Sequence, residues 1–208
     1  VNGQWVKGPG YDFFKVMKEK LGDKKVIAED LGFLTDAVHK LLADTKYPGM
    51  KVLEFAFGAW DDSIYLPHKY PENCIVYTGT HDNDTVVGWY ETMSEDDRNF
   101  LEHYLEYSTI DRTGKIYLDL ISLALESRGD TVIIPLQDYM GLGSEARINT
   151  PSTVGDNWEW RVKEEQLDED LKETIRTLTE KYRTRAQERS EEERKKKEAE
   201  EAAGKEEQ

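Results

Sequence analysis

Residues 74–85 read Cys74-Ile-Val-Tyr-Thr-Gly-Thr-His-Asp-Asn-Asp-Thr85, an apolar run that changes abruptly into a polar cluster. Short runs that are apolar on both faces are typical of buried parallel strands. Three further runs share this character: Val26-Ile-Ala-Glu-Asp30, Lys51-Val-Leu-Glu-Phe-Ala-Phe57 and Thr131-Val-Ile-Ile-Pro-Leu136. The sequence therefore predicts four buried strands.

Between these runs, apolar residues recur at helical spacing over residues 35–43, 94–107 and 116–126. The second segment begins with Ser94 and has Asp97 three residues later, a pattern that marks the start of a helix. The order strand, helix, strand, with right-handed crossovers, predicts an α/β fold around a parallel sheet.

The overall charge and the cysteine content limit the partners. Asp and Glu number 43 against 28 Lys and Arg, a formal net charge of −15. Such a surface repels phosphate backbones and anionic lipid, so we expect no nucleic-acid partner and no membrane. The chain has 1 Cys, and no Cys/His cluster has zinc spacing. We expect no disulfide, no metal, no cofactor and a reducing, cytoplasmic compartment.

The last 23 residues, 186–208, differ from the rest because they contain no aromatic residue and no Leu, Ile, Val or Met. They consist mainly of Glu, Lys and Arg, so they have nothing to bury. We expect a charged tail there, either a solvated helix held by Glu/Lys pairs or a disordered segment. The folded part would then be residues 1–185, which keep a net charge of −12.

Polar clusters follow the predicted strands at their carboxyl ends: Glu29-Asp30, Thr80-His-Asp-Asn-Asp84 and Gln137-Asp138. In barrels and doubly wound sheets the ligand binds at this edge. The alternative is that the acidic residues cap the helices that follow. That alternative suits Asp30 and Asp84, each of which precedes a short turn.

Glu29 fits the capping alternative less well, because it lies inside an apolar run and we expect it to be at least partly buried. Burial favours the protonated form of a carboxyl group. A protonated acid opposite a second carboxylate is the arrangement used in glycoside hydrolysis and transglycosylation. Asp82, at the end of another strand, would be that second carboxylate.

Six motifs in order resemble glycoside hydrolase family 77, the 4-α-glucanotransferases, also called amylomaltases or disproportionating enzymes. The resemblance runs from about residue 5 to about residue 182. The motifs are Ile27-Ala-Glu-Asp-Leu-Gly32, Pro48-Gly-Met-Lys-Val-Leu-Glu-Phe-Ala-Phe57, Tyr65-Leu-Pro-His68, Val76-Tyr-Thr-Gly-Thr-His-Asp-Asn-Asp-Thr85 with Gly88-Trp89, Gly141-Leu-Gly-Ser-Glu-Ala-Arg147 and Asn157-Trp-Glu-Trp-Arg161.

The resemblance implies a (β/α)₈ barrel of which this chain holds the C-terminal half, its four strands being the last four. It implies an enzyme that transfers α-1,4-glucan segments, with retention of configuration, to glucose or another glucan. Glu29 matches the general acid/base, and Asp82 matches the carboxylate that stabilises the transition state. His81, Asn149 and Phe55 match positions that contact glucose units.

Two residues depart from the family pattern. Glu54 stands where a Gln is common, and Ser152 follows Pro151 where the family usually has Gly. Either substitution could alter the fit of a sugar subsite without abolishing it.

The family's nucleophile is an Asp in an Arg-x-Asp-His sequence at the end of the fourth strand, and this chain has no match for it. Its Arg128-Gly-Asp130 precedes a strand, at the wrong end of a barrel for catalysis. A barrel takes about 250 residues. We therefore expect a fragment that needs a missing N-terminal half for activity, in a bacterial cytoplasm or, alternatively, a plastid. The alternative function is an inactive half-barrel that binds maltooligosaccharide.

Overall fold

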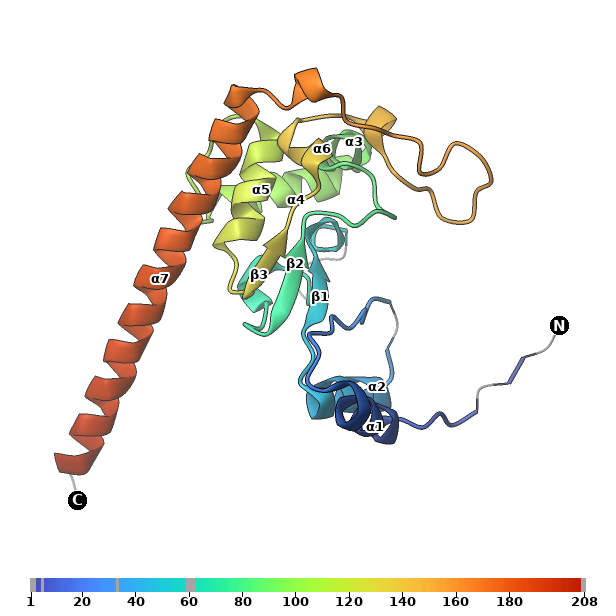
Figure 1. Cartoon of the computed structure of the whole chain (residues 1–208). Helices are drawn as coiled ribbons and strands as arrows, with labels where there is room; N and C mark the ends of the chain where they lie inside the picture. Colours follow the sequence, from blue (N-terminus) through green and yellow to red (C-terminus); the bar gives the residue numbers. More distant parts are fainter. Residues whose placement is uncertain (1–2, 5, 33, 59–62, 207–208) are drawn as a thin grey trace.

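The computed structural model describes residues 3–4, 6–32, 34–58 and 63–206. Three parallel strands, β1 (Gly49–Val52), β2 (Cys74–Tyr77) and β3 (Thr131–Ile133), form a sheet in the order β1-β2-β3. Their register pairs Gly49 with Cys74 and Ile75 with Thr131. β2 and β3 fall within predicted runs, whereas β1 begins two residues before its run and gives way to a 3₁₀ helix at residues 53–55. β3 is not the buried strand that was predicted, because Thr131 and Ile133 are exposed. The α/β arrangement is visible in Figure 1.

The strand predicted at residues 26–30 does not form, so the prediction of four strands is wrong. This segment is extended, but it makes one backbone hydrogen bond toward β1, from the amide of Ala28 to the carbonyl of Pro48 at 2.9 Å. Ile27 is 47% exposed. A strand needs a ladder of hydrogen bonds along at least one edge, and in the described part of the chain this segment has only that single backbone–backbone hydrogen bond to β1.

Four helices follow along the chain: α3 (Val86–Thr92), α4 (Glu95–Glu106), α5 (Ile116–Glu126) and α6 (Leu136–Tyr139). The Ser94 hydroxyl accepts a hydrogen bond from the amide of Asp97 at 3.1 Å, so the predicted start of α4 is confirmed. In the same way the Thr85 hydroxyl caps α3 by accepting from the amide of Gly88 at 3.1 Å.

Aromatic residues fill the core between the sheet and these helices. The ring of Phe57 is fully buried. The ring centroids of Trp89, Phe100 and Tyr104 lie 5.4–6.3 Å from its own centroid. Aromatic rings of this size contribute much of the apolar area that a small domain buries. The core therefore fixes the end of β1 against α3 and α4.

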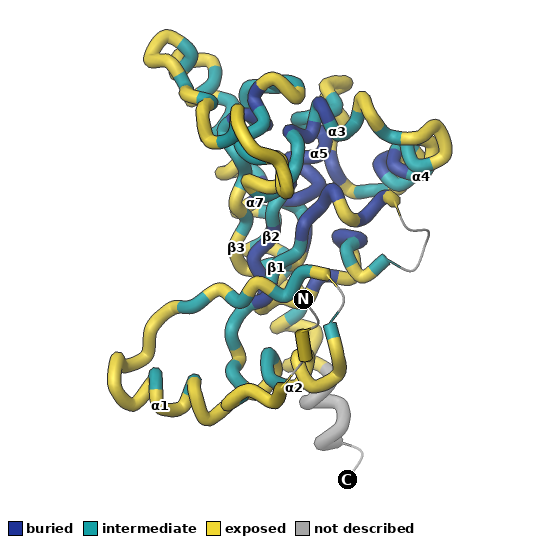
Figure 2. Tube along the Cα trace, turned by 90° about the vertical axis from the view of Figure 1, so that its right-hand side faces the viewer, coloured by how far each residue is buried: buried dark blue, intermediate teal, exposed yellow. Residues whose placement is uncertain are grey.

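Two helices near the N-terminus, α1 (Tyr11–Leu21) and α2 (Asp36–Thr45), lie apart from this core and contact each other (Figure 1). Neither contains a buried residue, and Figure 2 shows their exposed surface. Phe13 and Leu21 on α1 are 54% and 60% exposed. These helices therefore present apolar side chains that the described chain does not cover.

The final helix, α7 (Glu169–Glu206), runs for 38 residues without a break, across the division expected after residue 185. Leu178 and Tyr182 pack against α5, and Arg189 donates to the carbonyl of Glu126 at 3.1 Å. Glu193 forms an ion pair with Arg128 at 3.1 Å, and beyond this contact the helix projects away from the body (Figure 1). No helix among the described residues is long and apolar enough to span a membrane.

Candidate active site

A cleft with a volume of about 600 Å³ opens beside the carboxyl ends of β1 and β2. Its lining includes four of the five side chains selected from the sequence, Glu29, Phe55, His81 and Asp82. The fifth, Asn149, donates a hydrogen bond from its side-chain amide to Asp82 Oδ1 at 2.6 Å. The structure thus brings together residues that lie up to 120 positions apart in the chain.

Asp82 is held from several sides. Besides the Asn149 amide, the His81 Nε2 atom lies 3.2 Å from the same carboxylate oxygen. The Arg147 guanidinium donates to the main-chain carbonyl of Asp82 at 2.7 Å. The side chains of His81 and Asp82 are nevertheless 54% and 48% exposed, so both stay accessible from the cleft.

A tight turn after β2 presents these two residues. The Asn83 amide donates to the carbonyl of Thr80 at 3.1 Å, and the Asn83 side-chain oxygen accepts from the Thr80 amide at 3.0 Å and hydroxyl at 2.8 Å. Asparagine favours such turns because its side chain hydrogen-bonds nearby backbone. The turn Thr80–Asn83 therefore has its own internal support.

Arg147 and Trp158 are site residues that the sequence analysis did not select. Arg147 donates to the carbonyl of Asn149 at 2.9 Å within its own loop, residues 141–149, and its bond to the carbonyl of Asp82 joins that loop to the turn. The Trp158 ring lies beside the His81 ring with centroids 5.1 Å apart. Both residues belong to quoted motifs, and a charged or large aromatic side chain in a loop motif is the signal that could have identified them.

Phe55 enters the cleft from the short 3₁₀ helix η1 (Leu53–Phe55) that follows β1. Its ring meets Tyr65 edge-on with centroids 5.3 Å apart. Phe55 remains 39% exposed. It therefore offers an apolar face to the cleft.

The expectation that Glu29 is buried is wrong, because its side chain is exposed. It lies on the extended segment that replaces the predicted strand. The single backbone hydrogen bond of that segment, from Ala28 to Pro48, does not bury its side chains. The carboxylate reaches the cleft from its open side.

Asp30 and Asp84 do not cap helices, so that alternative is also wrong for both. Asp30 Oδ1 accepts from the amide of Met50 at 2.6 Å, which ties the extended segment to β1. Asp84 accepts from the Ser144 hydroxyl at 2.7 Å and thereby joins the turn to the 141–149 loop. The capping positions themselves are Thr35 and Thr85.

Two carboxyl groups are buried under the cleft, Glu54 at 7% and Asp138 at 1% exposed. Desolvation, followed by the charges of Asp138 and Asp84, raises the pKa of Glu54 from 4.5 to about 9. Burial likewise raises the pKa of Asp138 from 3.8 to about 6, although Thr78 donates to it at 2.6 Å and the amide of Val86 at 3.0 Å. Sequence reasoning missed Glu54 as a buried acid.

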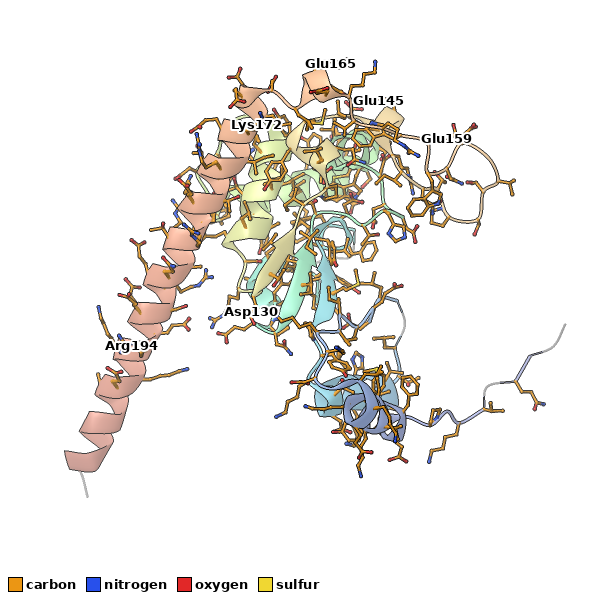
Figure 3. All side chains as sticks on the ribbon, viewed as in Figure 1. Asp130, Glu145, Glu159, Glu165, Lys172 and Arg194 are labelled. Atoms are coloured by element: carbon orange, nitrogen blue, oxygen red, sulfur yellow. The ribbon has the colours of Figure 1, made fainter. Side chains whose placement is uncertain are left out.

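Arg128-Gly-Asp130 lies at the opposite end of the sheet from the cleft, as expected. Asp130 directly precedes β3, and Figure 3 shows it at the far end of the sheet from Glu145 in the 141–149 loop. Among the described residues no group of three His, Cys, Asp or Glu side chains is arranged to hold a metal ion.

Comparisons with known proteins agree with the motifs. The sequence profile of the 4-alpha-glucanotransferases, glycoside hydrolase family 77, matches residues 1–168. A 4-alpha-glucanotransferase of Clostridium butyricum is 44% identical over 181 residues, covering 87% of this chain and 37% of that protein. A chloroplastic/amyloplastic 4-alpha-glucanotransferase of Arabidopsis thaliana is 44% identical over 160 residues, covering 77% of this chain and 27% of that protein.

A solved structure is similar as well. The amylomaltase from Streptococcus agalactiae in complex with acarbose superposes with a TM-score of 0.80 and 37% identity, over 87% of this chain and 36% of that one. The chain thus spans little more than a third of the length of these bacterial relatives.

Proposed function

The chain belongs to the 4-alpha-glucanotransferase family, and on that premise we propose that it supplies the acid/base side of a retaining glucanotransferase site. The observation that carries the proposal is the single cleft lined by Glu29, Phe55, His81 and Asp82, with Asn149 bonded to Asp82. The substrate is an α-1,4-glucan or maltooligosaccharide, whose neutral hydroxyl-rich rings suit a cleft of mixed polar and aromatic lining.

In this proposal Glu29 is the general acid/base. It protonates the glycosidic oxygen of the donor glucan as that bond breaks, and it later takes the proton of the acceptor hydroxyl. Its exposed position on the open side of the cleft leaves room for both the leaving and the entering sugar. Retention places acid/base and nucleophile about 5–5.5 Å apart.

Asp82 is the transition-state stabiliser. Its Oδ1 atom is oriented by Asn149 and His81, and a fixed carboxylate can bind sugar hydroxyls at the ring that becomes oxocarbenium-like. Holding the anion in place before the reaction means that little reorganisation is needed as positive charge develops. Phe55 and Trp158 offer apolar faces for neighbouring glucose rings.

The nucleophile comes, in this proposal, from the part of a full-length enzyme that this chain does not cover. The chain covers 37% of the Clostridium butyricum relative, and we propose that its sheet is the C-terminal half of a (β/α)₈ barrel. The exposed apolar residues Phe13, Val16 and Leu21 of α1 are suited to pack against that remaining part.

For the location we favour a bacterial cytoplasm over a plastid. The bacterial relative matches 87% of this chain, whereas the plastid relative matches 77%. The single cysteine, Cys74, is buried and unpaired, which suits a reducing compartment.

A half-barrel that only binds maltooligosaccharide is the second candidate. It is favoured by the contacts around Asp82, which come from this chain alone: the amide of Asn149, the ring of His81 and the guanidinium of Arg147. Isothermal titration with maltoheptaose measures this activity directly, and the first candidate predicts weak binding as well.

Activity separates the two candidates. The chain is incubated with maltotriose, alone and together with the N-terminal portion of the Clostridium butyricum enzyme that it does not match, and glucose release is followed. We expect release only from the mixture, and at least a hundredfold loss when Glu29→Gln replaces the wild type. The exposed Glu91→Gln is the matched control. Glucose release by the chain alone, or full activity of the Glu29→Gln mixture, would overturn the proposal.

A further inference from the structure

Glu54 lies directly beneath the turn that carries His81 and Asp82. Its amide donates to the carbonyl of Thr78 at 3.2 Å, which continues the pairing of β1 with β2. Its side chain then points under Gly79, so closely that a Cβ atom added at Gly79 would lie 2.6 Å from Glu54 Oε1. Only glycine leaves room for the carboxyl group at that point.

The surroundings of this carboxyl group disfavour its ionised form. Glu54 is 93% buried, and its Oε1 atom has no hydrogen-bond partner within the described structure. Two further carboxyl groups, Asp138 and Asp84, face it, and the opposing influences are a hydrogen bond with the Asn83 side chain and the charge of Arg147. An unsatisfied charge in such a place is costly, so Glu54 is neutral at pH 7.

Glu54 connects to the active-site turn through Asn83. The Asn83 side-chain oxygen closes the turn by accepting from the amide and hydroxyl of Thr80. The Asn83 side chain also lies near Glu54, since a Cβ atom added at Gly79 would be 3.1 Å from Asn83 Cβ and 2.6 Å from Glu54 Oε1, and its influence lowers the pKa of Glu54 against the larger effect of burial. The turn is therefore supported from below at the residue that closes it.

Arg147 supplies a second connection. Its guanidinium donates to the main-chain carbonyls of Asp82 and Asn149, and its positive charge also acts on Glu54. A negative charge on Glu54 would attract this guanidinium away from both carbonyls. It would also repel Asp138 and Asp84 from below the turn.

We propose that Glu54 is a positioning residue: its neutral carboxyl group supports the Thr80–Asn83 turn from below, and loss of its proton releases His81 and Asp82 from the arrangement that binds glucan. The structural part concerns this chain alone, while the effect on glucan binding rests on the proposed function. The support is intact at neutral pH and is lost as the pH rises through the pKa of Glu54, about 9.

The structural part is tested by nuclear magnetic resonance on the 208-residue chain. The ¹³C signal of the Glu54 carboxyl group and the amide signals of residues 80–83 are followed from pH 6 to pH 10. We expect all of them to change with one shared midpoint near pH 9. In Glu54→Gln the amide signals should show no transition near pH 9, whereas Glu91→Gln should behave like the wild type.

A Glu54 midpoint below pH 6, or turn signals that still titrate near pH 9 in Glu54→Gln, would overturn the inference. If Glu54→Gln does not fold, the carboxyl and amide midpoints of the wild type still decide the matter, because midpoints that differ by more than one pH unit would also overturn it.

The functional part is tested by titrating maltoheptaose into the same proteins at each pH. If binding requires neutral Glu54, the wild-type affinity falls about tenfold for each pH unit above the midpoint, and Glu54→Gln shows no such fall. An identical fall in both proteins would overturn the positioning role. No binding by any variant, combined with the shared midpoint, would instead contradict the proposed function and leave the structural part standing.

Discussion

Asp82 and Glu29 are carried by two regions that the chain supports very differently. The Thr80–Asn83 turn has its own internal hydrogen bonds and accepts others from Arg147 and Asn149. The buried Glu54 lies directly beneath it. The extended segment around Glu29 has one backbone hydrogen bond from Ala28 and one side-chain contact from Asp30. The chain therefore preorganises the side of the cleft that carries Asp82 and leaves the side that carries Glu29 open.

This difference indicates where the remaining part of an enzyme would act. A region with few contacts is ordered by whatever packs against it, and the segment carrying Glu29 adjoins α1 and α2, which have no buried residues. The turn carrying Asp82 needs no such partner. The predictions below test each side of this contrast.

Asp138→Ala should have the largest effect, on the well-supported side. It removes the acceptor for the Thr78 hydroxyl at 2.6 Å and the Val86 amide at 3.0 Å, both buried. Leaving two buried donors unpaired costs roughly 3 kcal/mol of unfolding free energy. Urea denaturation measures this loss of unfolding free energy, and Asp96→Ala on the exposed face of α4 is the control. A loss equal to that of the control would show that the turn is not built on this carboxylate.

Glu54→Gln should stabilise the chain in alkaline solution. The pKa of Glu54 is about 9 when folded and 4.5 as its ordinary value, so between these values the folded state holds a proton that the unfolded state lacks. Stability therefore falls as the pH rises through this window, by at most about 1.4 kcal/mol per unit, and it levels off above pH 9. Replacement by Gln removes this slope. The stability of the Gln variant relative to the wild type should therefore increase by roughly 2–3 kcal/mol between pH 7 and pH 9.

Denaturation curves at pH 6, 7, 8 and 9 measure this effect. Asp138, whose pKa is raised to about 6, contributes its own slope at lower pH, so the comparison is made from pH 7 upward. Parallel stability curves for the wild type and the Gln variant would contradict the burial of a neutral acid under the turn.

Asp30→Ala tests the weaker side. Its carboxylate accepts from the amide of Met50 at 2.6 Å and fills the space that a Cβ atom at Gly49 would occupy. We expect a loss of only about 1 kcal/mol. We also expect much faster hydrogen exchange at Ala28 and Met50, with no change at residues 80–83. Equal acceleration in the turn would mean that the two regions are not independent.

The sequence predicted three strands that form and a fourth that does not form. The run at residues 131–136 leads to β3, although Thr131 and Ile133 are exposed. The runs at residues 51–57 and 74–80 lead to β1 and β2, because their apolar character comes from burial in the core of the same chain. The run at residues 26–30 has the same character, but an apolar pattern reports what a complete sheet would bury, whereas a strand also needs a hydrogen-bonding neighbour.

The candidate site residues could likewise be predicted only in part. Residues at strand ends could be selected, because parallel strands bring their carboxyl ends together. The raised pKa of Glu54 could not, since it arises first from burial in the folded chain and then from the charges of Asp138 and Asp84, which lie 84 and 30 positions further along the chain. Arg147 could have been selected as a charged residue in a loop motif, but its role could not be predicted, because that role depends on reaching the main-chain carbonyl of Asp82 and a main-chain acceptor leaves no trace in the sequence.

The smallest effects on stability should come from the two site residues themselves. Asn149→Ala removes a hydrogen bond to a half-exposed carboxylate, which costs about 0.5 kcal/mol, and Glu29→Ala removes an exposed side chain and should cost nothing measurable. Maltoheptaose binding to the isolated chain should weaken severalfold in Asn149→Ala, because Asp82 loses a partner that orients it. Binding should be unchanged in Glu29→Ala, because the segment that carries Glu29 has few contacts that would hold its side chain against a bound sugar. Equal losses of affinity in the two variants would show that both sides of the cleft are already organised, and the contrast between the two regions would fail.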